Sequence, residues 1–231
     1  MSRNKSLVFD AGPLISLTSN NLLWILKKLK KHFKGEFYIT SEVEQELVHR
    51  PLNSKRFKFE ALQVMKEIKK GVIKVVDNER IKSLAKELIG LANHCFSAHN
   101  NYIQVVHMGE MEVVATGILM NASALVIDER TMRYLIENPI KVKRRLQRKL
   151  HTYVHVDKTA LKKLQRRLRG LKVIRSVELI SVAYEMGLLN EYIPDLIESK
   201  SILLDAVLWG VKIDGCAVSE KEIDEIEKLI K

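Results

Sequence analysis

Four acidic residues occupy positions from which their carboxylates could meet: Asp10, Glu46, Glu110 and Asp128. Asp10 and Asp128 each end a short apolar run, and sites in open α/β sheets form at the carboxyl ends of such strands. Carboxylate oxygens are the ligands that Mg²⁺ and Mn²⁺ prefer. A bound ion can polarise a phosphoryl oxygen and lower the pKa of an attacking water. The pattern therefore predicts a hard-cation site for phosphate-ester chemistry, with all four acids as catalytic metal ligands.

Each of the four acids also has an ordinary structural explanation. Asp10 could simply cap a helix, and Asp128 could be a turn residue after a strand. Glu46 could lie on a solvated helix face, and Glu110 could stabilise a helix N-terminus through the dipole. Against these readings, four clustered carboxylates repel one another when no cation is bound. Their convergence would therefore be hard to explain as a contribution to stability.

Three further residues are candidates for a supporting role around the acids: Ser16, Glu112 and Glu129. Ser16 could donate a hydrogen bond to the acidic site or be a helix-interior hydroxyl. For Glu112 and Glu129 a surface position is the more ordinary expectation. The residues His94 and Cys95, with the histidines that follow them, fit no standard zinc spacing. They are expected to be a core cysteine with surface histidines.

The elements expected to position these residues are strands and helices in alternation. Strands are expected at 5–10, 37–40, 72–76, 124–128 and 172–176. Ser41 and Glu44 have the spacing of a capping box, which predicts a helix that begins there and carries Glu46. Further helices are expected at 22–33, 79–107 with a break around 99–101, 110–120 and 178–189. Strands that are apolar throughout are typical of a parallel sheet covered on both faces.

A basic segment, residues 139–170, interrupts this alternation. It holds twelve Lys or Arg and one acid, Asp157, so it carries the whole net charge of +11. An excess concentrated in this way favours a polyanionic partner, with nucleic acid first; a solvated helix face is the alternative. Two basic elements are expected around a strand-like centre, where Tyr153 stands between His151 and His155. The residues predicted to bind nucleic acid are Lys141, Lys143, Arg144, Arg145, Arg148, Lys149, Lys162, Lys163, Arg166, Arg167 and Arg169.

Composition and length set the remaining expectations. The 231 residues allow one large domain, or a domain with a sub-domain. Two cysteines, Cys95 and Cys216, imply no disulfide framework. No apolar run reaches the about 18 residues of a membrane span, and the N-terminus lacks the pattern of a signal peptide. A cytoplasmic location with no membrane partner is the simple expectation.

The motifs that carry the four acids resemble those of the PIN-domain family. VFDAGPLISL is similar to the family's opening, ITSEVEQELV to its second motif, GEMEVVATG to its third and ALVIDER to its fourth. LKVIRSVELISVAYEMGLL resembles the last strand and helix, with Ser176 at a position where a small hydroxyl residue is common. The third acid, Glu110, departs from the commoner Asp.

The resemblance implies a three-layer α/β/α sandwich with a parallel sheet of roughly five strands. It implies a PIN-like nuclease domain over 1–192, with 139–170 as a basic insertion and 193–231 as a helical extension. The implied activity is cleavage of single-stranded RNA with Mg²⁺ or Mn²⁺, and DNA is not excluded. Two alternatives stay open: a non-catalytic RNA- or ribosome-binding protein, and a toxin of a toxin–antitoxin pair, against which the extra length speaks. A homodimer is also left open.

Overall fold

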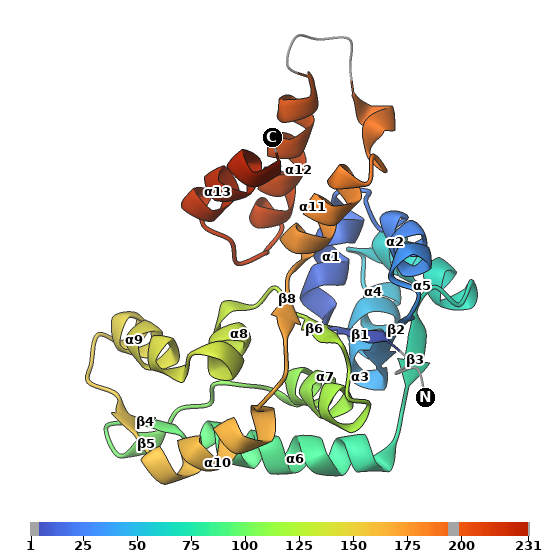
Figure 1. The fold of residues 1–231 in the computed structure, drawn as a ribbon. Coiled ribbons are helices and arrows are strands. Elements are labelled where there is room, and N and C mark those ends of the chain that lie inside the picture. The colour runs from blue at the N-terminus through green and yellow to red at the C-terminus, as the bar shows by residue number, and fades with distance from the viewer. Residues whose placement is uncertain (1–4, 194–198, 231) are drawn as a thin grey trace.

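The computed structural model describes residues 5–193 and 199–230, and five parallel strands form its central sheet. The strand order is β3-β2-β1-β6-β8 (Figure 1). The strands are β1 (Ser6–Phe9), β2 (Glu36–Thr40), β3 (Lys74–Val76), β6 (Ala124–Val126) and β8 (Val173–Ile174). All residues of β1 are buried, as expected for the middle strand of a sheet that is covered on both faces. The predicted fold class and sheet are confirmed.

Helices cover this sheet on both sides (Figure 1). On one side α7 (Met108–Leu119) contacts β1, β2 and β6, and α6 (Glu79–Asn93) packs against α7. The other side carries α1 (Ala11–Ser19), α2 (Ile25–Phe33) and α5 (Lys58–Lys69). Gly117 of α7 lies against β6 so closely that an added Cβ would overlap the side chain of Leu125. This contact explains a glycine in the middle of a helix.

The helix that carries Glu46 begins one residue earlier than the capping-box spacing predicts. Thr40 is the N-cap, with an extended backbone, and its hydroxyl accepts a hydrogen bond from the Val43 amide at 3.3 Å. Ser41 is already inside the helix because β2 runs directly into it. The helix is formed by α3 (Ser41–Glu44), the π-helical η1 (Gln45–His49) and α4 (Arg50–Leu52). Glu46 lies in the π-helical part, a local geometry that is frequent at functional sites.

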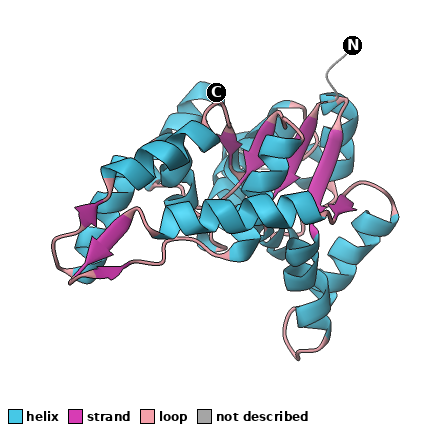
Figure 2. Cartoon of the chain, turned by 90° about the horizontal axis from the view of Figure 1, so that it is seen from below, coloured by secondary structure: helices cyan, strands magenta, loops and turns pink. Residues whose placement is uncertain are grey.

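A second sheet replaces part of the helix that was expected over 79–107. The helix α6 ends at Asn93, and the chain then forms β4 (Phe96–Ala98) and β5 (Asn101–Tyr102). The two turn residues, His99 and Asn100, have φ of 49° and 63°, which is the geometry of a tight hairpin turn. The prediction of helix was wrong here, and a three-stranded antiparallel sheet, β5-β4-β7, forms instead (Figure 2).

The basic segment forms two helices around the third strand of that sheet. After α8 (Arg130–Glu137) come α9 (Pro139–Leu150), β7 (His155–Val156) and α10 (Lys158–Leu168). The expected pair of basic elements around a strand-like centre is thus confirmed. Apolar side chains of both helices are buried, so the segment is packed on the body and does not project from it.

The described residues of the C-terminal part form helices that pack on the domain. They are α11 (Ser176–Glu185), η2 (Asn190–Tyr192), α12 (Ser199–Ile213) and α13 (Glu220–Ile230). Helix α12 contacts both α11 and α1. The expected division at residue 193 adjoins residues 194–198, which, with 1–4 and 231, lie outside the described residues. Within the described ranges, no helix is both long and apolar enough to span a bilayer.

Candidate active site at the carboxyl ends of the strands

Asp10 and Asp128 leave neighbouring strands at the same edge of the sheet. Phe9 pairs with Val126 in the register of β1 and β6, and the Asp10 amide donates to the Val126 carbonyl at 3.0 Å. Gly12, in the first turn of α1, lies against the side chain of Asp128, since an added Cβ would be 3.5 Å from its Cβ. Two carboxylates that are 118 positions apart in sequence are thereby delivered to one place.

The charges of all four predicted acids meet around Asp10. The pKa of Asp10 is raised to about 7, first by burial and then by the negative charges of Glu110, Glu46 and Asp128. Within the described parts of the chain, no Lys, Arg or His forms an ion pair with any of these four carboxylates. The cluster is therefore electrostatically uncompensated, which is the situation that binding of a cation would relieve.

Glu110 serves the helix end and the acidic cluster at the same time. Its Oε2 accepts a hydrogen bond from the His107 amide at 2.7 Å, which caps α7. Its pKa is nevertheless raised, mainly by burial and further by the charges of Glu129 and Glu46. The structural and functional explanations of Glu110 are thus compatible.

Glu46 is the exposed member of the cluster. It stands at the rim of a cavity of about 240 Å³ whose walls are largely apolar. Leu47, Phe57 and Val64 are among the residues of this wall. Glu46 therefore faces solvent beside this cavity, which lies between α1, η1 and α5.

Asp128 is held by three hydrogen bonds and is 2% exposed. The Ser176 amide donates to Oδ1 at 2.7 Å, and its hydroxyl donates to Oδ2 at 2.7 Å. The Ser16 hydroxyl also donates to Oδ2, at 3.0 Å. Ser16 thus lies where a supporting residue was expected. A carboxylate offers about four lone-pair sites, so this arrangement leaves Asp128 with little free coordination capacity.

Glu112 and Glu129 take up different positions around α7. Glu129 caps α8 by accepting from the Met132 amide at 2.6 Å, and its charge reaches Glu110. Glu112 is buried, so the expectation of a surface position was wrong. Burial raises its pKa, and its charged neighbours are Glu42, Lys82 and Asp77, not Asp10. Two residues along a helix turn the side chain by about 200°, which separates Glu112 from the cluster at Glu110.

The oxygen donors of the four acids suit a hard divalent cation, but the carboxylates are not drawn closely together. Asp10, Glu46 and Glu110 supply oxygen atoms without a cationic partner, as Mg²⁺ or Mn²⁺ requires. Among the residues that the structure describes, however, no three His, Cys, Asp or Glu side chains are grouped closely enough to hold a metal ion. The acids share one electrostatic environment but do not form a finished coordination shell.

The C-terminal part of the chain contributes contacts that the sequence did not reveal. The Ala217 amide donates to the Asp128 carbonyl at 3.1 Å. Arg175 donates to the Ala217 carbonyl at 3.2 Å and pairs with Glu222 at 2.9 Å. The Cys216 thiol has its pKa raised to about 12 by burial and by the charge of Asp128. No motif or spacing links residue 217 to residue 128, so only the folded structure shows this contact.

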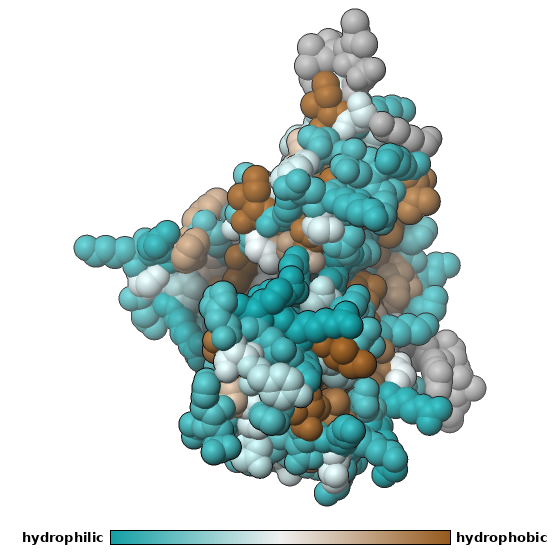
Figure 3. All heavy atoms as spheres, turned by 90° about the vertical axis from the view of Figure 1, so that its left-hand side faces the viewer, coloured by the Kyte–Doolittle hydropathy of each residue, from teal (hydrophilic) through white to brown (hydrophobic). Residues whose placement is uncertain are grey.

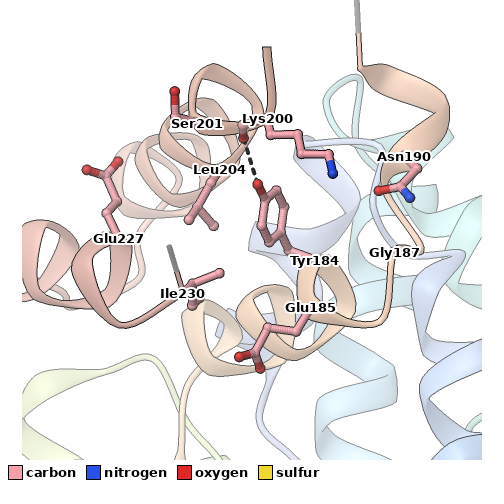
Figure 4. A pocket seen from close by; sticks show the side chains of 9 residues that line it. All are labelled: Tyr184, Glu185, Gly187, Asn190, Lys200, Ser201, Leu204, Glu227 and Ile230. Carbon is pink, nitrogen blue, oxygen red and sulfur yellow. Dashed lines mark hydrogen bonds between the residues drawn. The ribbon is translucent and has the colours of Figure 1, made fainter. Parts of the chain in front are cut away.

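A larger cavity lies elsewhere (Figure 4). It measures about 860 Å³ and lies between α11, η2, α12 and α13. The side chains of Leu204 and Ile230 point toward it, and the Tyr184 hydroxyl donates to the Lys200 carbonyl at 2.8 Å across one side. None of the four acids lines this cavity, so size alone does not identify the chemical site.

The predicted nucleic-acid-binding residues lie on α9 and α10 or directly after α10. Nine of the eleven are exposed, whereas Lys143 and Arg145 are partly buried. Arg167 forms an ion pair with Glu87 at 2.6 Å. Helix α8, which follows Asp128 and Glu129, connects the acidic edge of the sheet with α9 (Figure 1).

Comparison with known proteins agrees with this arrangement. A family model described as a PIN domain matches residues 6–142, more than half of the chain. The matched range contains Asp10, Glu46, Glu110 and Asp128 and ends at the start of α9. No curated protein and no solved structure matches the chain.

Proposed function

The chain belongs to the PIN-domain family, and on that premise we propose that it is an endoribonuclease that requires Mg²⁺ or Mn²⁺. PIN domains are generally nucleases. The observation that carries the proposal is the convergence of the acids at one edge of the sheet, where the end of β1 is bonded to the end of β6 and Gly12 lies against Asp128. The raised pKa of Asp10 agrees with it, since burial is its first cause and the charges of Glu110, Glu46 and Asp128 add to it. Such a cluster costs stability unless a cation is bound.

The four acids have unequal roles in this proposal. Asp10, Glu46 and Glu110 would hold the cation, because their oxygens are not fully engaged by donors of the protein. Asp128, fixed by Ser16 and Ser176, would add negative charge and keep the strand end in place. The bound cation would supply polarisation of the phosphoryl oxygen and a lowered pKa for the attacking water.

The cations of α9 and α10 would bind the phosphates of the substrate. An acidic site repels a polyanion, so binding energy must come from another part of the surface. Contacts of Lys and Arg with phosphates give affinity and orientation but little sequence preference. RNA is the proposed substrate, and single-stranded DNA of the same sequence is the comparison that tests the sugar requirement.

The test is cleavage of an end-labelled single-stranded RNA by the purified full chain with Mn²⁺ or Mg²⁺, and with EDTA. We expect cleavage that depends on the metal. Asp10→Asn should lower the cleavage rate by at least about 100-fold, because loss of a residue that only supports a metal ligand already costs up to this factor. Glu44→Gln is the matched control, because it removes the same charge two positions from Glu46 and should retain activity. Equal cleavage by wild type and Asp10→Asn would refute the proposal.

A non-catalytic RNA-binding role is the second candidate. The three hydrogen bonds to Asp128 favour it, since they engage a carboxylate that the sequence predicted to be a metal ligand. Under this alternative the chain binds RNA equally well in EDTA and in Mn²⁺ and leaves the RNA intact. Intact RNA together with tight binding would therefore select this candidate.

A further inference from the structure

The small antiparallel sheet has one apolar face and one face of aromatic side chains. Ser97 of β4 pairs with Tyr102 of β5 and with His155 of β7, and directly paired residues project from the same face. Ser97 thus lies in the middle of a row that has a ring at each end. The neighbouring residues Phe96 and Ala98 point to the opposite face and are buried. The row faces away from the core.

Two more rings extend this row at its ends. The ring centroids of His94 and Tyr102 are 4.5 Å apart, and those of Tyr153 and His155 are 4.8 Å apart. The two tyrosines are 60% and 59% exposed. Because neighbouring strands are about 4.8 Å apart, the backbones of β5 and β7 are separated by roughly 10 Å, with Ser97 on the strand between them. The exposed rings are therefore carried on both outer strands of one small sheet.

Basic elements flank the end of the aromatic row that carries Tyr153 and His155. The Lys143 Nζ lies 4.5 Å from the centroid of the Tyr153 ring and donates to its hydroxyl at 3.3 Å. Helices α9 and α10 directly precede and follow the turn and strand that carry Tyr153 and His155. The single acid of the segment, Asp157, is engaged in capping α10 through the Thr159 and Ala160 amides. Figure 3, which faces this side of the molecule, shows a mainly hydrophilic surface with pale patches and smaller brown, hydrophobic ones.

We propose that this aromatic row, formed by His94, Tyr102, Ser97, His155 and Tyr153, binds unpaired bases of single-stranded RNA whose phosphates lie on α9 and α10. The charge of the flanking helices selects a polyanion, and exposed rings select flat partners. The faces of bases are accessible in a single strand and hidden in a duplex. The choice of RNA rests on the proposed function, but the aromatic row contains none of the four acids.

The known strength of stacking predicts how much each tyrosine should contribute to RNA affinity. Stacking of a base on an aromatic side chain is worth about 1–3 kcal/mol, so each tyrosine should contribute roughly tenfold or more to affinity. The test is fluorescence anisotropy of the full chain with a labelled single-stranded RNA in EDTA, where no metal-dependent cleavage can occur. The same strand as a duplex, and as an abasic strand with the same number of phosphates, provides the comparison.

We expect the double variant Tyr102→Ala/Tyr153→Ala to bind the single strand about 100-fold more weakly, the product of the two single contributions. Tyr102→Phe/Tyr153→Phe should retain most of the affinity, because the rings remain. Tyr192→Ala is the matched control, since Tyr192 is 48% exposed on η2, outside the row. The salt dependence of binding should be unchanged in the alanine variant, because no charge is removed.

Two results would overturn the proposal. One is equal affinity of the wild type for the intact and the abasic strand. The other is unchanged RNA binding by the alanine variant, which would reassign the exposed rings to a protein partner. Failure of the nuclease proposal gives a different pattern, in which RNA is not cleaved in Mn²⁺ while the tyrosine dependence of binding in EDTA persists. Circular dichroism should confirm that the exposed substitutions leave the fold intact.

Discussion

Ser176 holds Asp128 through two hydrogen bonds, one from its amide and one from its hydroxyl, each of 2.7 Å. The first residue of α11 is thereby attached to the end of β6, across the boundary between the last two strands of the sheet. A buried carboxylate needs such donors, because burial without hydrogen bonds is costly.

We expect Ser176→Ala to lower the free energy of unfolding by about 1–3 kcal/mol, the cost of leaving part of a buried charged group without a donor. Urea denaturation at pH 7 measures it. Ser181→Ala in the same helix is the control, because its hydroxyl donates to the Val177 carbonyl within the helix. Ser181→Ala should therefore change the free energy of unfolding by no more than about 0.5 kcal/mol. Equal losses for both variants would argue against a special role for the contact with Asp128.

The stability of the metal-free protein should fall as the pH rises through the titration of Asp10. Its pKa is about 7 when folded, against the ordinary value of 3.8 for an aspartate side chain. The folded state therefore binds a proton that the unfolded state has lost between these values, so stability decreases from about pH 4 to about pH 7. In EDTA, Asp10→Asn should be more stable than wild type at pH 8 by roughly 2–4 kcal/mol.

Urea denaturation at pH 4, 6 and 8 measures this difference between the two proteins. At pH 4 the difference should nearly vanish, because Asp10 is then neutral in the folded protein. Other titrating groups are common to both proteins and cancel. A difference that does not change with pH would show that Asp10 does not titrate in this range.

Addition of Mn²⁺ at pH 8 should stabilise the wild type, because a ligand that binds only the folded state adds stability. At 100 times the dissociation constant the gain is about 2.7 kcal/mol. The gain should be smaller at pH 5.5, because protons compete for the carboxylates. Thermal unfolding with and without Mn²⁺ measures it. Asp10→Asn should lose the gain and Glu44→Gln should keep it; equal gains in wild type and Asp10→Asn would place the metal elsewhere.

Two glycines inside helices should respond to alanine in opposite ways. Gly117→Ala should destabilise by about 1–3 kcal/mol, because the added Cβ overlaps Leu125 in the core. Gly90→Ala in α6 meets no atom within 4 Å and should stabilise by up to about 1 kcal/mol through helix propensity. Chemical denaturation of both variants shows whether each substitution raises or lowers the free energy of unfolding. A stabilising Gly117→Ala would mean that α7 is not pressed against β6.

The sequence predicted the central sheet and the convergence of its acids because strong local signals carry both. Apolar runs that end in Asp10 and Asp128 indicate parallel strands that finish at one edge. Local signals failed for β4 and β5, which contain three and two residues and are joined by a turn without glycine. The burial of Glu112 depended on the packing around α7, and the contact of Ala217 with Asp128 depended on tertiary structure alone. Neither the burial of Glu112 nor the contact of Ala217 with Asp128 produces a periodic pattern in the sequence.

The pairing of β7 with β4 limits how the basic segment can be studied. Ser97 and His155 are register partners, and the Asp157 amide donates to the Cys95 carbonyl at 2.9 Å. Deletion of residues 139–170 would therefore strip β4 of its neighbour and leave an open strand edge beside the buried ring of Phe96. Such edges promote aggregation, so a truncated protein could fail a test of the proposed RNA binding for reasons unrelated to charge. Charge-neutralising substitutions on exposed positions of α9 and α10 avoid this confusion.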